Sequence, residues 1–211
     1  MLLCLLIHII HKKCINKGGF IMITTRKKLP DILTDEEAKR LIEIPNKRYY
    51  TGLRNKAMIT LMINTGLRVS EVTNLKTNQV DLNSRSLKVV NGKGHKDRNL
   101  KIPNLTAEIL KQWNKKRSQG EYLFNTKEGK QLKVRYIQAM IKRYSVRATI
   151  DKNIYPHTLR HTFATNFYRQ TKDIETLRKL LGHSDISTTQ IYITLANIDV
   201  ENAMNNYREI A

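Results

Sequence analysis

Cysteine, proline, glycine and acidic residues are all scarce in this chain of 211 residues, and each shortage excludes something. Cys4 and Cys14 are the only cysteines and lie close together at the start, so no disulfide framework holds the rest of the chain, which fits a reducing cytoplasm. Repeats, low-complexity tracts and linkers rich in proline and glycine are absent, so no internal domain boundary is expected after about residue 45. With 40% hydrophobic residues, one globular domain can build a core.

Long hydrophobic runs are also missing. The opening MLLCLLIHIIHKKC contains about ten apolar residues, whereas a membrane-spanning helix needs about 20. It lacks the charged start and the small-residue cleavage site of a signal peptide. His8, His11 and Cys14 have no second ligand cluster at a matching spacing, which argues against a metal site there. Met22 offers an alternative start that would leave out residues 1–21, and residues 1–29 are expected to be an extension outside the fold.

Acidic residues are outnumbered by basic residues. The chain has 38 Lys and Arg against 18 Asp and Glu, a formal net charge of +20. A surplus this large on a folded domain favours a polyanionic partner, either nucleic acid or an anionic membrane surface. No long basic amphipathic helix with a continuous apolar face is present, which makes the membrane surface the poorer alternative.

Hydrophobic periodicity predicts a mainly helical domain. In LTDEEAKRLIEI, Thr34 begins a capping box, and Pro45 ends the helix that follows. The next helix is expected at 54–64 with Gly66 as its C-terminal cap, followed by a short helix from about Ser70. Further helices are expected at 106–118, 134–149, 158–170 and 174–181, then a short helical segment around Tyr192 and a final helix from Asp199.

The spacing of hydrophobic residues changes from a helical to a strand-like period between residues 80 and 102. VDLNSRSLKVV and RNLKIP read as strands on either side of NGKGHKD, a turn opened by an Asn-Gly pair. The predicted fold class is therefore mainly α with a small antiparallel β-sheet. Lys93, Lys96 and Arg98 lie on or beside this turn, where basic side chains commonly contact phosphates. Glycines on both sides of Lys93 permit a close approach to a DNA backbone.

Two motifs place arginine beside potential partners. In TGLRVSE, Arg68 lies at the entrance of a short helix with Glu71 in its first turn. In HTLRHTFAT, His157 and Arg160 are three residues apart and share a helix face. His157 and His161 are four apart, but the residue after His157 is threonine rather than the glutamate of a zincin, so no metal is expected.

His183 and Tyr192 form the last pair of candidates. His183 follows Gly182, which caps a helix. Tyr192 alone reads as an amphipathic aromatic at the edge of a core. Considered together with the arginines, histidine and lysine above, the set suits transfer of a phosphodiester to a protein hydroxyl. That reaction needs cations on the non-bridging oxygens, an acid for the leaving oxygen and a nucleophile in line.

Four motifs in this order, TGLRVSEV, NGKGHKDRNLKIP, HTLRHTFAT and LLGHSDISTTQIYI, resemble the catalytic domain of the tyrosine recombinase (phage integrase) family. The resemblance covers roughly residues 30–205. It implies the α+β catalytic-domain fold of that family over residues 30–211, with a tail helix at about 195–211. By the resemblance, the active-site residues are Arg68, Lys93, His157, Arg160, His183 and Tyr192, with Glu71 as the supporting acid.

The resemblance implies a site-specific recombinase or integrase that acts on double-stranded DNA by integration, excision or inversion. Tyr192 would attack the scissile phosphate to give a 3′-phosphotyrosyl bond and a free 5′-hydroxyl, without metal, ATP or cofactor. Arg68 and Arg160 would stabilise the charge of the transition state, because guanidinium groups bind phosphate oxygens in a bidentate geometry. His157 would accept the proton of Tyr192, because a free phenol, with a pKa of about 10, is a poor nucleophile.

The remaining residues receive supporting roles from the resemblance. His183 would donate a hydrogen bond to the phosphate, and Lys93 would protonate the leaving 5′-oxygen. Lys96 is a substitute for Lys93 and, with Arg98, a DNA contact. Glu71 would orient Arg68.

The family usually carries an N-terminal core-binding domain, which we expect to be absent here because few residues precede Arg68. Strand exchange implies a homotetramer on paired DNA sites, joined through the C-terminal helix, although that helix has an equal chance of packing on its own domain. Two alternatives stay open. One is a DNA-binding remnant that regulates a recombination site without cutting it, and the other is a topoisomerase-like relaxase.

Overall fold

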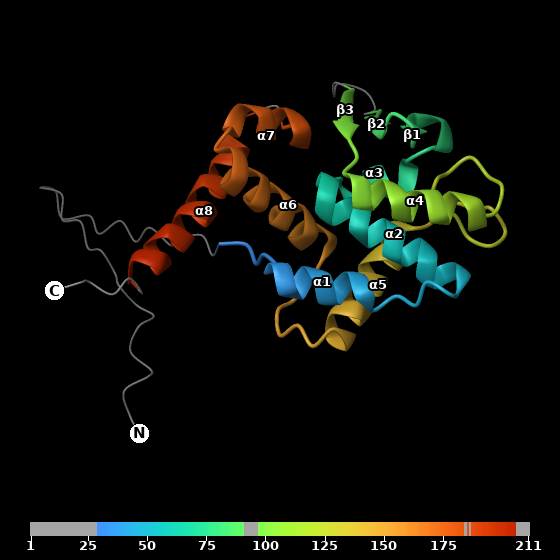
Figure 1. Ribbon diagram of the computed structural model, residues 1–211, viewed down its shortest axis with the longest axis horizontal. Helices are drawn as coiled ribbons and strands as arrows, with labels where there is room; N and C mark the ends of the chain where they lie inside the picture. The colour runs from blue at the N-terminus through green and yellow to red at the C-terminus, as the bar shows by residue number, and fades with distance from the viewer. Residues whose placement is uncertain (1–28, 91–96, 184, 186, 206–211) are drawn as a thin grey trace, which may run out of the picture.

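In the part of the chain that the structure describes, eight helices carry a three-stranded sheet on one side (Figure 1). The structure, a computed structural model, describes residues 29–90, 97–183, 185 and 187–205. Within that part, no helix is long and apolar enough to cross a membrane. The elements in chain order are α1 Asp35–Glu43, α2 Tyr50–Thr65, α3 Val69–Asn74, the 3-10 turn η1 Thr77–Gln79, β1 Val80–Asp81, β2 Ser86–Val89, β3 Arg98–Lys101, α4 Asn104–Lys116, α5 Val134–Arg147, α6 Pro156–Thr171, α7 Ile174–Leu181 and α8 Ser187–Asn205.

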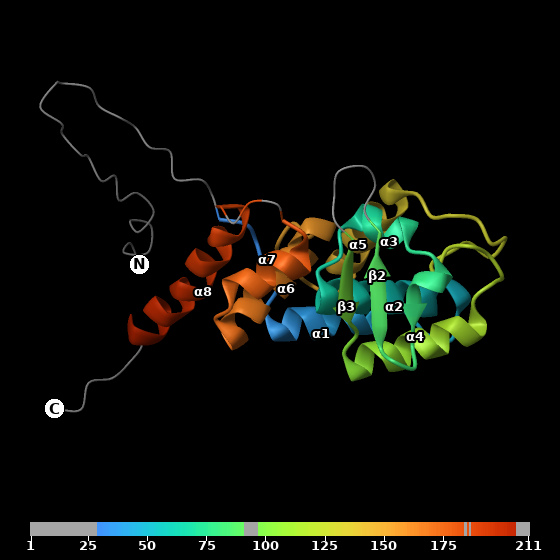
Figure 2. The ribbon, with the colours of Figure 1, turned by 90° about the horizontal axis from the view of Figure 1, so that it is seen from above.

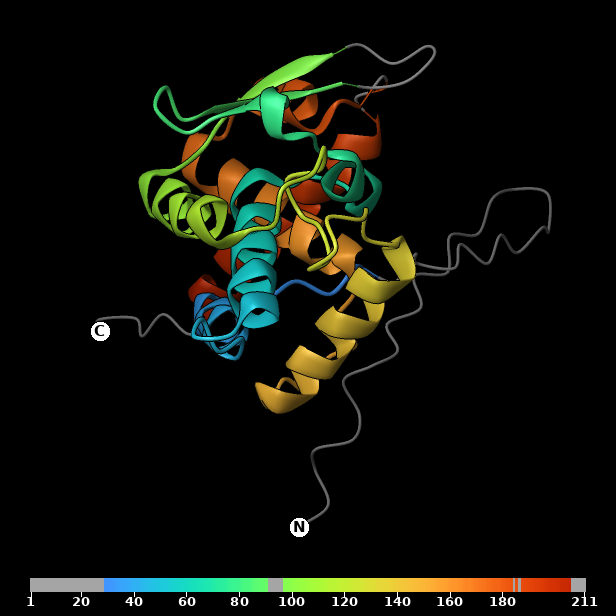
Figure 3. The same cartoon turned by 90° about the vertical axis from the view of Figure 1, so that its right-hand side faces the viewer.

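Helix α2 is the centre of the main core. Ala57, Met58, Ile59, Leu61 and Met62 on this helix are fully buried. The helix packs against α1, α4 and α6, and Figure 3 shows it between the sheet and α1. Most residues of α2 are buried, polar Arg54 and Asn55 among them, which agrees with its central place.

Capping explains where α1 begins. The Thr34 hydroxyl accepts a hydrogen bond from the Glu37 backbone N–H (3.2 Å), and the Glu37 carboxylate accepts one from the Thr34 N–H (2.8 Å). The predicted capping box is confirmed, and the helix ends at Glu43, two residues before Pro45.

The sheet is antiparallel in the order β1-β2-β3. Leu87 and Leu100 face each other across β2 and β3 and are buried, whereas Lys88 and Asn99, the next pair, are exposed. The single strand predicted over 80–90 is wrong in one respect. A turn at 82–85, in which Asp81 accepts backbone hydrogen bonds from Asn83 and Ser84, divides it into β1 and β2.

Helices α6, α7 and α8 enclose a second hydrophobic cluster made by Ala164, Leu177, Leu181, Tyr192 and Leu195. Figure 2 shows α8 leaving this cluster and extending away from the remaining helices. The prediction of a break between a segment at Tyr192 and a helix from Asp199 is wrong, because α8 is continuous from Ser187 to Asn205. Residues 1–28 of the predicted extension at 1–29 lie outside the described residues, and Leu29 packs against this second cluster.

Candidate active site

The guanidinium of Arg160 lies between the ends of two helices. Its Nη1 donates to the carbonyl of Gly66 (2.6 Å), and its Nη2 donates to the carbonyl of Leu181 (2.7 Å). Gly66 caps α2 and Gly182 caps α7, each with a left-handed φ of 65°. Carbonyls at helix C-termini carry partial negative charge, which attracts a cation. Arg160 is therefore fixed in place although its side chain is buried.

Burial lowers the pKa of Arg160 to about 10, and repulsion from Arg68 adds to this effect. The side chain stays cationic at neutral pH. A buried cation that is already desolvated interacts strongly with an anion that enters the site.

Arg68, Glu71 and Arg98 form an ion cluster at the start of α3. The Glu71 carboxylate accepts from the Arg68 backbone N–H (2.7 Å) and from Arg68 Nη1 (3.1 Å). Arg98 donates to both carboxylate oxygens, with distances of 2.9 and 2.8 Å. Burial raises the pKa of Glu71, but the hydrogen bond and charge of Arg98 and the Arg68 backbone outweigh it, so the pKa is lowered. Glu71 is thus an anion that orients two arginines.

Arg98 has a buried side chain, whereas the predicted role as a DNA contact needs an exposed one. Its side chain is 8% exposed, and its Nε donates to the Leu180 carbonyl (2.7 Å) in addition to the two bonds to Glu71. Most of the donors of its guanidinium are therefore used inside the protein. This residue begins β3, so it joins the base of the β2–β3 hairpin to α3 and α7. Lys93 and Lys96 lie in that connection, outside the described residues.

His183 contacts Arg160 on one side and α8 on the other. Its Nε2 lies 3.0 Å from Arg160 Nη2, and its Nδ1 lies 3.0 Å from Thr189 Oγ1. Because a guanidinium only donates, Nε2 is the acceptor, and Nδ1 carries the proton and donates to Thr189. Burial, Arg160 and Arg68 lower the pKa of His183 to about 4, so the ring is neutral at pH 7.

Tyr192 points from α8 toward α6. Its side chain is 2% exposed, and its hydroxyl lies 3.1 Å from Nδ1 of His161. Burial raises the pKa of Tyr192, and the charges of Arg160 and Arg68 oppose that increase without cancelling it. The phenol is therefore protonated at neutral pH, yet it lies in the electrostatic field of both arginines.

His161 is a member of the site that the sequence interpretation missed. Its spacing from His157 is the only signal in the sequence, and it suggests a metal pair rather than a partner for a tyrosine. The ring centroids of His157 and His161 are 6.4 Å apart, and those of His161 and Tyr192 are 5.7 Å apart. His157 itself is exposed on the first turn of α6. The structure thus brings Arg68, Glu71, Arg160, His183 and Tyr192 into one cluster, with His157 at its edge.

Comparisons with known proteins identify the family of this chain. The family model described as the Phage integrase family matches residues 31–197. The tyrosine recombinase XerD of Staphylococcus saprophyticus is 35% identical over 208 residues, which cover 94% of this chain and 70% of that protein. The XerD of Staphylococcus aureus strain N315 is 36% identical over 188 residues, which cover 86% of this chain and 63% of that protein.

Solved structures show the same fold. The XerA recombinase superimposes with a TM-score of 0.74 and 32% identity, covering 87% of this chain and 68% of that one. The XerH recombinase bound to a palindromic difH substrate gives a TM-score of 0.73 and 28% identity, covering 86% of this chain and 54% of that one. The predicted fold class, mainly helical with a small antiparallel sheet, is confirmed. This chain belongs to the phage integrase family, the family of tyrosine-type site-specific recombinases.

Proposed function

We propose that this chain cleaves and rejoins double-stranded DNA at specific sites, with Tyr192 as the nucleophile. One observation carries the proposal. The Tyr192 hydroxyl is buried in a site where Arg68 and Arg160 both act on its pKa, and both are held in place by carboxylate or carbonyl groups of the protein. Fixed cations next to a hydroxyl are what transfer of a phosphodiester to that hydroxyl requires.

In the proposed step, the Tyr192 oxygen forms a bond to the phosphorus while the bond from phosphorus to the 5′-oxygen breaks. The products are a 3′-phosphotyrosyl link and a 5′-hydroxyl, so the phosphoester energy is retained and rejoining is the reverse reaction. Arg68 and Arg160 stabilise the extra negative charge of the pentacoordinate phosphorus. His183 accepts a hydrogen bond from Arg160 Nη2 and so helps to orient that guanidinium, and Lys93 is proposed to protonate the 5′-oxygen.

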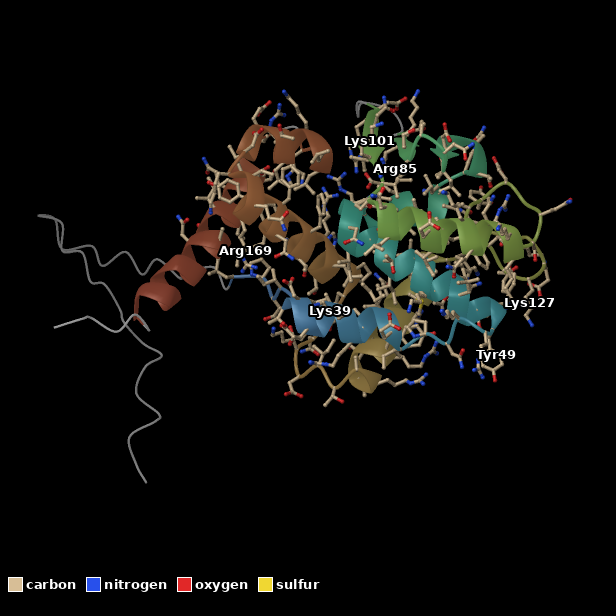
Figure 4. The ribbon with its side chains drawn as sticks, viewed as in Figure 1. Lys39, Tyr49, Arg85, Lys101, Lys127 and Arg169 are labelled. Atoms are coloured by element: carbon tan, nitrogen blue, oxygen red, sulfur yellow. The ribbon has the colours of Figure 1, made fainter. Side chains whose placement is uncertain are left out.

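DNA is the proposed partner because of the charge of the chain and because of its relatives. The net charge is +20. Figure 4 shows Lys39 on α1, Lys101 on β3 and Lys127 between α4 and α5 extending outward from separate parts of the molecule. XerH was solved bound to its difH substrate. Action on cellular DNA places this protein in the cytoplasm, and the choice between integration, excision and inversion depends on the sites it joins.

We further propose that the protein works as a homotetramer on paired sites. Helix α8 continues to Asn205, well beyond Ala196, which is buried against the rest of the domain. A helix that extends past its own domain can pack on a neighbouring copy. Attachment of the tail to its own domain is the alternative, and crosslinking of DNA-bound protein distinguishes the two.

Covalent trapping tests the nucleophile. Wild type, Tyr192→Phe and Tyr49→Phe would be mixed with nicked and supercoiled DNA taken from the flanks of the gene, with chelator present, and analysed on denaturing gels. Tyr49 is 68% exposed and serves as the matched control. We expect an adduct with wild type and Tyr49→Phe and none with Tyr192→Phe.

Three outcomes contradict the proposal. An adduct with Tyr192→Phe means that another group is the nucleophile. Binding of wild type without an adduct on any DNA favours the regulatory remnant, which the present arrangement of the site does not support. Relaxation of supercoils without recombination between sites indicates a relaxase.

A further inference from the structure

The contact between His161 and Tyr192 gives the phenol a specific partner. The hydroxyl oxygen is 3.1 Å from Nδ1 of His161, a hydrogen-bond distance, and the two rings are tilted by 48°. The ring centroid of His157 is 6.4 Å from that of His161. His161 is partly buried, whereas His157 is exposed.

We propose that His161, and not His157, positions the Tyr192 hydroxyl and accepts its proton during attack on DNA. This inference rests on the proposed function of Tyr192. As the phenol oxygen bonds to phosphorus, its proton moves to Nδ1 of His161, which becomes an imidazolium. The 5′-oxygen leaves and takes a proton from a separate acid. In the rejoining step, His161 returns the proton to Tyr192.

The surroundings of His161 keep its Nδ1 unprotonated, so that this nitrogen can accept a proton. Burial lowers the pKa of His161, and the charges of His157 and Arg160 lower it further, to about 4 in all. The ring is therefore neutral at pH 7. A neutral ring with its proton on Nε2 has a free electron pair on Nδ1, which faces the hydroxyl. The charged and titratable groups around it are His157 and Arg160 on α6, Tyr192 on α8 and His183 after α7.

A weak base can act here because the proton moves as negative charge develops. The phosphodiester brings one negative charge, and the pentacoordinate phosphorus carries a second. An imidazolium that forms beside this dianion is stabilised by it in a poorly solvated site. Transfer before DNA binds is unfavourable, because burial disfavours a charged His161 ring and His157 and Arg160 oppose its positive charge.

Nitrogen NMR of the DNA-free protein tests the contact without requiring activity. Imidazole ¹⁵N spectra of wild type, Tyr192→Phe and His157→Asn would be compared at pH 7. We expect a His161 ring protonated at Nε2 only, whose Nδ1 signal shifts when the hydroxyl is removed in Tyr192→Phe and stays in place in His157→Asn. A proton on Nδ1, or an Nδ1 signal that does not shift in Tyr192→Phe, overturns the proposal.

Three variants at one position test the chemistry on DNA. The side-chain oxygen of His161→Asn can occupy the position of Nδ1, whereas that of His161→Gln reaches the position of Nε2, and His161→Ala has no acceptor. We expect the single-turnover rate of adduct formation to fall about 100-fold or more in His161→Ala and His161→Gln, with partial recovery in His161→Asn. Rescue by one of the two amides and not by the other excludes a purely structural role.

The pH dependence provides a second readout. In wild type, the rate should fall on the acid side as His161 is protonated, and this acid limb should be absent in His161→Asn. Equal rates for wild type and His161→Ala, with Tyr192→Phe inactive, overturn the role of His161 and leave Tyr192 as nucleophile. An adduct in Tyr192→Phe overturns the proposed function itself.

Discussion

At the scale of single residues, the ion cluster of Arg68, Glu71 and Arg98 stabilises the site. The side chains of Glu71 and Arg98 are each 8% exposed. Removing one partner of a buried pair leaves the other charge desolvated and unpaired, which is the costly case. We therefore expect Glu71→Gln to lower the free energy of unfolding by about 3 kcal/mol at pH 7, measured by urea denaturation.

The same pair predicts how stability depends on pH. The pKa of Glu71 is lower in the folded protein than its ordinary value of 4.5, so its contribution is present above that value. The contribution is lost as the pH falls through the folded pKa, and wild type and Glu71→Gln should converge there. Glu43→Gln is the control, because Glu43 is 73% exposed in its pair with Lys56 and should cost less than about 1 kcal/mol. A constant difference down to pH 3 would contradict the assignment.

The resemblance of four ordered motifs to the phage integrase family predicted Arg68, Arg160, His183 and Tyr192 as site residues, because each local signal alone is weak. The roles of Arg98 and His161 could not be predicted in this way. Arg98 meets Glu71 only after the hairpin folds against α3, and His161 meets Tyr192 only after α8 packs on α6. Contacts between distant segments depend on packing, which a local pattern does not contain.

At the scale of elements, two helices end in a glycine next to Arg160. A Cβ on Gly66 would lie 2.4 Å from the Phe163 ring, and the φ of +65° is strained for any other residue. We expect Gly66→Ala to lower the free energy of unfolding by at least about 1 kcal/mol and to slow adduct formation, because the carbonyl that holds Arg160 must shift. Thr51→Ala, exposed on the same helix, should stay within about 0.5 kcal/mol. Wild-type stability for Gly66→Ala would show that this cap tolerates a side chain.

Helix ends with strong local signals were predicted well, and those without them were not. The capping box at Thr34 and the glycine after Leu181 fix the limits of α1 and α7 by local chemistry. Helix α8 has no such signal between Tyr192 and Asp199, and its continuity follows from packing of Tyr192, Leu195 and Ala196 under α6 and α7. The split of the first strand follows from hydrogen bonds that Asp81 makes in the turn.

At the scale of the whole molecule, positive charge is the dominant property. We expect affinity for a 30-base-pair duplex of arbitrary sequence to fall steeply with salt, by about 10³-fold or more between 50 and 200 mM if six or more phosphates are neutralised. Fluorescence anisotropy measures this dependence. Peptide nucleic acid of the same sequence, which has no phosphates, is the control and should bind weakly at both concentrations. A flat response with DNA would exclude phosphate neutralisation as the source of affinity.

The single long helix that carries Tyr192 also connects the nucleophile mechanically to the far end of the domain. About 20 Å of rigid helix separates Tyr192 from Asn205. A small tilt of α8 about its packed end therefore moves its distal end through a larger arc than the phenol. Tyr192 must stay within hydrogen-bond distance of His161 to pass on its proton. We therefore expect that a contact that fixes the distal end of α8 also keeps the nucleophile beside its base.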